Sequence, residues 1–128
     1  MDLNEYFNDV NGHAVLASAN SDGIVDAAIY AKPHIMDQDT IAFIMPDRLT
    51  HQNLLSNPHA AYLFIEAGET LAGKRFFLTK IKEEKDSELL YAIHRKNYGK
   101  DETARYLVFF KVDKILPLIG AGEDKEKE

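Results

Sequence analysis

The sequence predicts one α+β domain, mainly β, in which six antiparallel strands form a barrel with short flanking helices. Its 128 residues suit a single domain with one hydrophobic core. Six apolar segments of strand length are separated by connections rich in Gly, Asp and Pro. Long helices do not alternate with these segments, which favours an antiparallel barrel over a doubly wound parallel sheet.

The first elements follow from periodicity and turn residues. Residues 2–10 place apolar side chains at the i, i+3, i+4 and i+7 positions of a short amphipathic helix. Residues 13–20 and 24–31 flank Ser21, Asp22 and Gly23, a turn sequence that predicts a β-hairpin. Pro33 is predicted to end the second strand.

The remaining elements are predicted in the same way. A third strand, 40–45, is closed by Pro46, and a helix over 47–57 starts with Asp47 as its N-cap. Three more strands are expected, at residues 59–66, 74–84 and 105–112, and one more helix is expected at residues 86–98. The domain is predicted to span residues 1–119, followed by a charged, disordered tail over 120–128.

The composition excludes several chemistries. Without cysteine there is no disulfide, thiol nucleophile, Cys-ligated zinc or iron–sulfur cluster. The five histidines lack metal-binding spacing, so no metal site is predicted, and no sequence motif identifies a catalytic residue. With no long apolar run and no signal-peptide pattern, a cytoplasmic protein without membrane contact is expected.

The net charge of −6 is unevenly distributed. Residues 1–64 contain eight acidic side chains and only two basic ones, Lys32 and Arg48, whereas residues 65–128 contain thirteen of each sign. An acidic chain argues against nucleic-acid binding, which needs a basic surface.

Three segments have both a functional and an ordinary interpretation. Arg48 and Thr50 follow a strand end at a helix start, an arrangement that favours an anion, but it is also typical of a capped surface helix. Small residues such as Ala27 and Ala28 leave room for a flat ring, or else simply fill a narrow barrel. Lys74 and Arg75 form a basic strand start, which also protects a strand from edge pairing.

From about residue 13 to 84, the order of these motifs resembles the FMN-binding split-barrel proteins related to pyridoxamine 5′-phosphate oxidase, in particular their minimal single-domain members. The resemblance implies a split β-barrel and FMN bound between the two subunits of a homodimer. The sequence lacks the Trp- and Arg-bearing motif with which true pyridoxamine phosphate oxidases end, so vitamin B6 oxidation is not expected.

The resemblance also implies cofactor-binding positions. Ala27, Ala28, Ile29 and Lys32 correspond to the second strand, which lies against the flavin. Ile44 and Met45 correspond to the third-strand end along the ring. The phosphate-binding Ser-Arg-Lys of the family falls on Arg48, Leu49 and Thr50, which is a departure. Lys74 and Arg75 begin the fifth strand, where Arg75 stands in place of a Gln near the flavin.

The function expected from this resemblance is an FMN-binding flavoprotein that works as an oxidoreductase or electron carrier. Two alternatives remain open. One is a reductase of the same fold that uses the deazaflavin F420, and the other is a non-catalytic module that binds FMN or haem. No sequence motif identifies the redox partner or the substrate.

Overall fold

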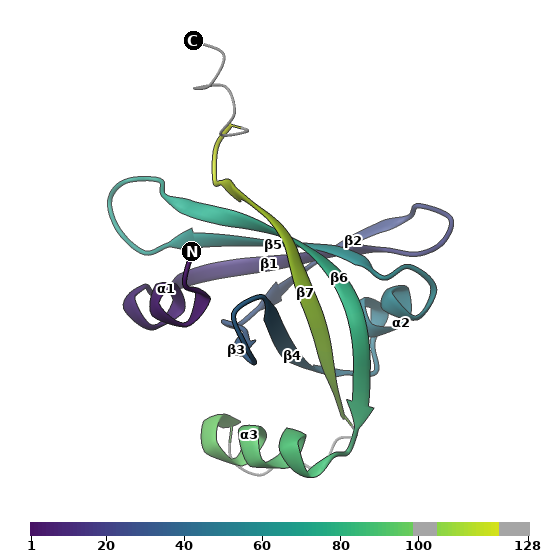
Figure 1. Cartoon of the computed structure of the whole chain (residues 1–128). Coiled ribbons are helices and arrows are strands. Elements are labelled where there is room, and N and C mark those ends of the chain that lie inside the picture. The colour runs from purple at the N-terminus through teal and green to yellow at the C-terminus, as the bar shows by residue number, and fades with distance from the viewer. Residues whose placement is uncertain (99–104, 121–128) are drawn as a thin grey trace.

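The computed structural model describes residues 1–98 and 105–120. Within these ranges it confirms an α+β domain dominated by antiparallel strands (Figure 1). The elements in chain order are α1 (Leu3–Asp9), β1 (Gly12–Ala19), β2 (Val25–Tyr30), β3 (His34–Ile35), β4 (Thr40–Pro46), α2 (Leu49–Ser56), β5 (His59–Glu66), β6 (Gly73–Lys85), α3 (Glu88–Tyr98) and β7 (Arg105–Pro117).

The prediction of an antiparallel, mainly β fold is confirmed, but the prediction that six strands form a barrel needs two corrections. The described residues form seven strands, in the sheet order β2-β1-β5-β6-β7-β4-β3, and the sheet is open because β2 and β3 are its edges. The additional strand, β3, pairs His34 with Ala42 and Ile35 with Ile41. Two residues directly after Pro33 are too few to show an alternating pattern, so the sequence offered no signal for this strand.

The open sheet is nevertheless strongly curved. Tyr30 at the β2 edge meets Phe43 of β4 with ring centroids 5.7 Å apart, and the Tyr62 hydroxyl donates to the Ala31 carbonyl at 2.8 Å. The concave side encloses the main core, to which α1 adds Leu3 and Phe7. The fully buried residues of this core are large and apolar, and they include Leu16, Ile41, Met45, Tyr62, Phe64, Phe76 and Phe110.

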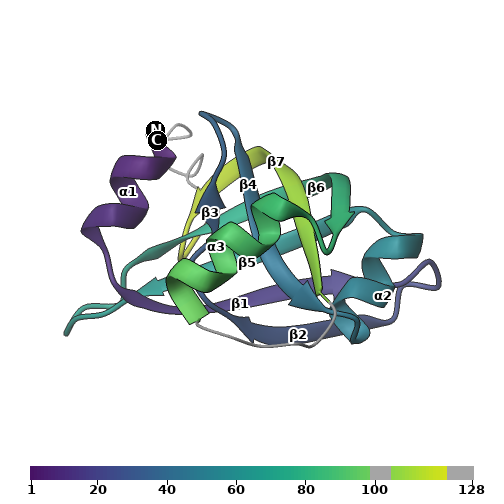
Figure 2. The ribbon, with the colours of Figure 1, turned by 90° about the horizontal axis from the view of Figure 1, so that it is seen from below.

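Helix α3 covers the opposite face of β4 and β7 (Figure 2). Leu90 of this helix is buried against Ala42, Leu107 and Phe109. Both faces of β4 and β7 are therefore covered, and residues 105–110 of β7 accordingly carry few polar side chains.

Several element ends differ from the expectation. Strand β7 continues to Pro117, because its charged segment stays paired with the equally long β6 across two register shifts. Residues 121–128, most of the predicted tail, lie outside the described residues. No helix in the described ranges is long and apolar enough to cross a membrane.

Candidate functional site

A pocket of about 380 Å³ lies between edge strand β2 and the start of α2, two elements that lie next to each other in Figure 2. Such a volume is within the range of small-ligand sites, about 300–1,000 Å³. The pocket is lined by Asp26, Ala28, Ile29, Tyr30, Ala31, Pro46, Arg48, Leu49 and Thr50. It therefore brings together five of the predicted cofactor-binding residues: Ala28, Ile29, Arg48, Leu49 and Thr50.

The start of α2 presents free hydrogen-bond donors to this pocket. The N-cap residue is Arg48, in extended conformation, and it makes no side-chain cap. The first backbone N–H groups of a helix have no partner inside the helix, so those of Leu49 and Thr50 remain available. The guanidinium of Arg48 is exposed and forms no ion pair with the described part of the chain. An uncapped helix start beside a free guanidinium favours an anion.

Asp47, the predicted N-cap, has a different role. Its carboxylate accepts a hydrogen bond at 2.9 Å from Nδ1 of His51, one helical turn later. Since this carboxylate is directed to the His51 ring, it leaves the first-turn amides uncapped.

The β2 side of the pocket contributes an acidic group and a phenol. Asp26, Ala28 and Tyr30 alternate along β2 and lie on its half-buried side. The Thr50 hydroxyl donates to Asp26 Oδ2 across 3.4 Å, a long hydrogen bond. Burial raises the pKa of the Tyr30 hydroxyl, the charge of Asp26 adds to this rise, and hydrogen bonding with Thr50 opposes it.

The other face of α2 is held by a buried histidine. His51 is only 2% exposed and stacks on Tyr106 with ring centroids 3.8 Å apart. Its Nε2 lies 3.0 Å from Glu83 Oε1, which also accepts from Lys80 Nζ at 2.6 Å. Both imidazole nitrogens lie within hydrogen-bond distance of a carboxylate, Asp47 on one side and Glu83 on the other, so the ring links α2 to β6. The sequence places His51 among five histidines without distinguishing it, because its partners come from distant elements.

The pKa of Glu83 lies below its ordinary value. Partial burial opposes this shift, but hydrogen bonds and charges from Lys80 and His51 outweigh it. Glu83 is therefore an anion that ties β6 to α2.

The remaining predicted residues lie away from the pocket. Lys32 is engaged elsewhere, because its Nζ donates to the carbonyls of Phe7 at 2.8 Å and Val10 at 2.7 Å, at the end of α1. Met45 is fully buried in the main core, and Ile44 packs against the cluster beneath α3.

The basic start of β6 is also engaged with the chain itself. Lys74 Nζ lies 5.6 Å from the centre of the Tyr6 ring. The guanidinium of Arg75 donates to the carbonyls of Pro117, at 2.9 Å, and Gly120. In this chain, both bases contact neighbouring elements rather than the pocket next to α2.

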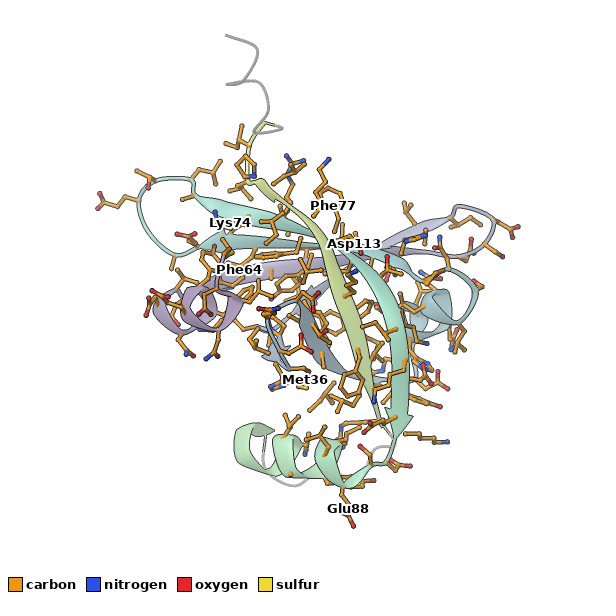
Figure 3. The ribbon with its side chains drawn as sticks, viewed as in Figure 1. Met36, Phe64, Lys74, Phe77, Glu88 and Asp113 are labelled. Carbon is orange, nitrogen blue, oxygen red and sulfur yellow. The ribbon has the colours of Figure 1, made fainter. Side chains whose placement is uncertain are left out.

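The convex face of β2, β1, β5 and β6 is apolar and only partly covered. Cross-strand pairing aligns Ile29, Val15 and Leu63 in one row, which ends on Arg75, and Ala27, Ala17, Ala61 and Phe77 in the next. Figure 3 shows Phe77 on this outer side and Phe64 on the inner side of the sheet. Val25 and Ile29 are 78% and 77% exposed. We define the apolar outer face by these residues: Val15, Ala17, Val25, Ala27, Ile29, Ala61, Leu63 and Phe77.

A second pocket, of about 520 Å³, lies between α1 and the β3–β4 hairpin. Its lining includes the carboxylates of Asp2 and Asp37 but no basic side chain. This pocket is larger, but the two carboxylates in its lining repel an anionic ligand.

Comparison with known proteins identifies the fold. No protein-family model and no curated protein matches the sequence. Among solved structures, an FMN-binding protein from Syntrophomonas wolfei aligns with a TM-score of 0.75 at 18% identity, covering 88% of this chain and 81% of that one. A candidate pyridoxamine 5′-phosphate oxidase from Listeria innocua aligns with a TM-score of 0.67 at 17% identity, covering 91% and 97%. An F420 reductase aligns with a TM-score of 0.67 at 14% identity, covering 87% and 94%.

Proposed function

This chain has the split-barrel fold of the pyridoxamine 5′-phosphate oxidase-like proteins, and on that premise we propose that it is an FMN-binding flavoprotein. The phosphate of FMN is proposed to bind at the start of α2. The observation that carries this proposal is the uncapped first turn of α2 beside the free guanidinium of Arg48, in a pocket formed with β2.

The residues of the pocket fit the two ends of a flavin. Arg48, the Thr50 hydroxyl and the first-turn amides of α2 are the donors for a phosphate. Ala28 provides little side-chain bulk on β2, and Ile29 provides an apolar wall for a ring system. When bound, FMN supplies the electron or hydride transfer, while the chain binds and orients it. We assign no general acid or base.

We further propose that the protein is a homodimer that buries the apolar outer face. Continuous exposed apolar surface of this kind is typical of protein interfaces. Ile29 belongs both to this face and to the pocket lining, so a second copy placed there would border the cofactor.

Light scattering after gel filtration tests the dimer. The expected mass is twice the 14.5 kDa of one chain. Val25→Glu places a charge on the proposed interface and should give a monomer, whereas Ile81→Glu, at a residue also exposed on β6 but outside the set that defines that face, should not. A wild-type monomer at micromolar concentration contradicts the dimer.

The absorbance spectrum of the purified protein, before and after incubation with FMN, tests the cofactor. A flavin spectrum that survives gel filtration is expected, and a colourless protein that does not retain FMN contradicts the proposal. Reduction of the bound flavin by NADH or NADPH with turnover would identify an enzyme, and its absence a binding module.

The deazaflavin F420 is the second candidate, since an F420 reductase shares this fold and the phosphate-binding segment departs from the FMN pattern. Parallel titration with FMN and F420 separates the two. Haem is less compatible with the pocket, because its described lining residues include no His, Met or Cys, and burial raises the pKa of Tyr30, which disfavours the phenolate that would ligate iron. A Soret band after incubation with haem would overturn that choice.

A further inference from the structure

We propose that Asp26 is a specificity-determining residue of the α2 pocket, and that its carboxylate reduces the advantage of a phosphorylated flavin over the same flavin without phosphate. The inference rests on the proposed function, because it concerns the same site. It predicts a pocket with only a weak preference for FMN over riboflavin.

The charges that line the pocket nearly cancel. Among the described residues that line it, Arg48 and Asp26 are the only charged ones, and they carry opposite charges. A phosphate monoester carries a charge of about −1.5 to −2 at neutral pH. It therefore gains attraction from Arg48 but is repelled by Asp26. A half-buried carboxylate is screened less by salt than an exposed one, so its repulsion persists at physiological ionic strength.

Asp26 also competes for a donor that a phosphate requires. The Thr50 hydroxyl has a single proton, for which the Tyr30 oxygen competes with the hydrogen bond to Asp26 Oδ2. At 3.4 Å this bond is long, so the hydroxyl can be redirected, but the carboxylate then loses its partner. The Asp26 carboxylate makes no other hydrogen bond or ion pair within residues 1–98 and 105–120, and a phosphate at Thr50 leaves it uncompensated.

The effect of Asp26 reaches Tyr30, the next polar residue on the same side of β2. The charge of Asp26 contributes to the raised pKa of the Tyr30 hydroxyl. Asp26 and Tyr30 both line the pocket, and both lie on the half-buried side of β2, so the carboxylate faces the pocket rather than bulk solvent alone. The same field disfavours any additional negative charge at this position.

Replacing the carboxylate by an amide tests the inference. In Asp26→Asn, side-chain volume is retained, and the amide can donate to a phosphate oxygen. Fluorescence-quenching titrations give the dissociation constants of FMN and riboflavin. The ratio of the riboflavin constant to the FMN constant should increase about tenfold in Asp26→Asn, because removal of one nearby negative charge strengthens FMN binding. The riboflavin constant itself should change less than about twofold.

Asp22→Asn is the matched control, because it removes the same charge from the exposed tip of the β1–β2 hairpin, outside the pocket lining. Its ratio should equal that of the wild type. An unchanged ratio in Asp26→Asn, or an equal increase in both variants, overturns the inference.

Binding of inorganic phosphate separates this inference from the flavin proposal. Titration with inorganic phosphate is monitored through the NMR chemical shifts of the Leu49 and Thr50 backbone amides. It should saturate at about tenfold lower phosphate concentration in Asp26→Asn than in the wild type. If this occurs but neither flavin binds, the proposed cofactor is wrong and the role of Asp26 stands. If phosphate affinity is unchanged, the role of Asp26 is refuted whatever the flavin result.

Discussion

The two faces of α2 carry polar sites of opposite character. On the buried face, the ring of His51 is enclosed by Tyr106 and two carboxylates, and Asn53 Nδ2 donates to Ser18 Oγ at 3.1 Å. On the pocket face, Arg48 has no partner among the described residues and the first-turn amides are uncapped. Polar groups that satisfy one another hold a structure together, whereas donors left unsatisfied in a pocket are available to a ligand.

This difference predicts that mutations on the two faces affect different properties. A change on the buried face should reduce stability. A change on the pocket face should reduce ligand affinity and leave stability unchanged.

The largest effect is expected for His51→Ala. The variant loses the stacking on Tyr106 and leaves Glu83 without one of its two hydrogen-bonding partners, so unfolding free energy should fall by about 3 kcal/mol. Urea denaturation followed by circular dichroism measures this. His51→Phe restores the ring but not the hydrogen bonds, and its loss should be smaller.

His13→Ala is the control for His51→Ala, since His13 is exposed on β1. It should change stability by less than about 0.5 kcal/mol. If the two alanine variants are equally stable, the His51 network contributes nothing and the contrast between the two faces fails.

A smaller effect, on affinity alone, is expected for Arg48→Ala. Losing one charge-assisted hydrogen bond to phosphate should weaken FMN binding at least about tenfold, or about 1.5–3 kcal/mol. Calorimetric titration with FMN measures it, and thermal denaturation should show an unchanged midpoint. Lys111→Ala, which removes an exposed base from β7, should leave the FMN dissociation constant unchanged. A loss of stability in Arg48→Ala would show that this face is structural too.

The smallest effect is expected from acid. The folded-state pKa of Glu83 is below its unfolded value of 4.5, so its stabilising contribution is present above that pH and is lost as the pH falls through the lower folded value. Because Glu83 is partly exposed, the loss should be on the order of 1 kcal/mol. It is measured as the difference between wild type and Glu83→Gln in denaturation at several pH values. A difference that does not shrink below pH 4.5 contradicts this account.

Local patterns were sufficient to predict most of the elements. The β1–β2 hairpin was predicted from its Ser-Asp-Gly turn, where Asn20 Oδ1 accepts from the amides of Asp22 at 2.9 Å and Ile24 at 3.0 Å. Strand β5 has the bounds expected from its apolar run. These features depend on residues within a few positions of one another, and such interactions can be read from a sequence.

The errors occurred where a distant partner decides the outcome. Asp47 was expected to cap α2, but the approach of β6 and β7 positions His51 as its partner. Lys32 was expected near the cofactor, but the end of α1 provides two carbonyls that hold its ammonium. Asp26 was not considered for the pocket at all, because only the packing of β2 against α2 brings it next to Arg48 and Thr50.

The sequence by itself determined the fold class, the order of nearly all elements and a helix start, at Arg48 to Thr50, suited to an anion. Alternation, turn residues and charge distribution are local properties, so they needed no structure. Only the tertiary structure decided that the sheet is open and seven-stranded, and that Asp26 shares a pocket with Arg48. Curvature of the sheet brings β2 against α2, and pocket electrostatics depends on distances that no local pattern specifies.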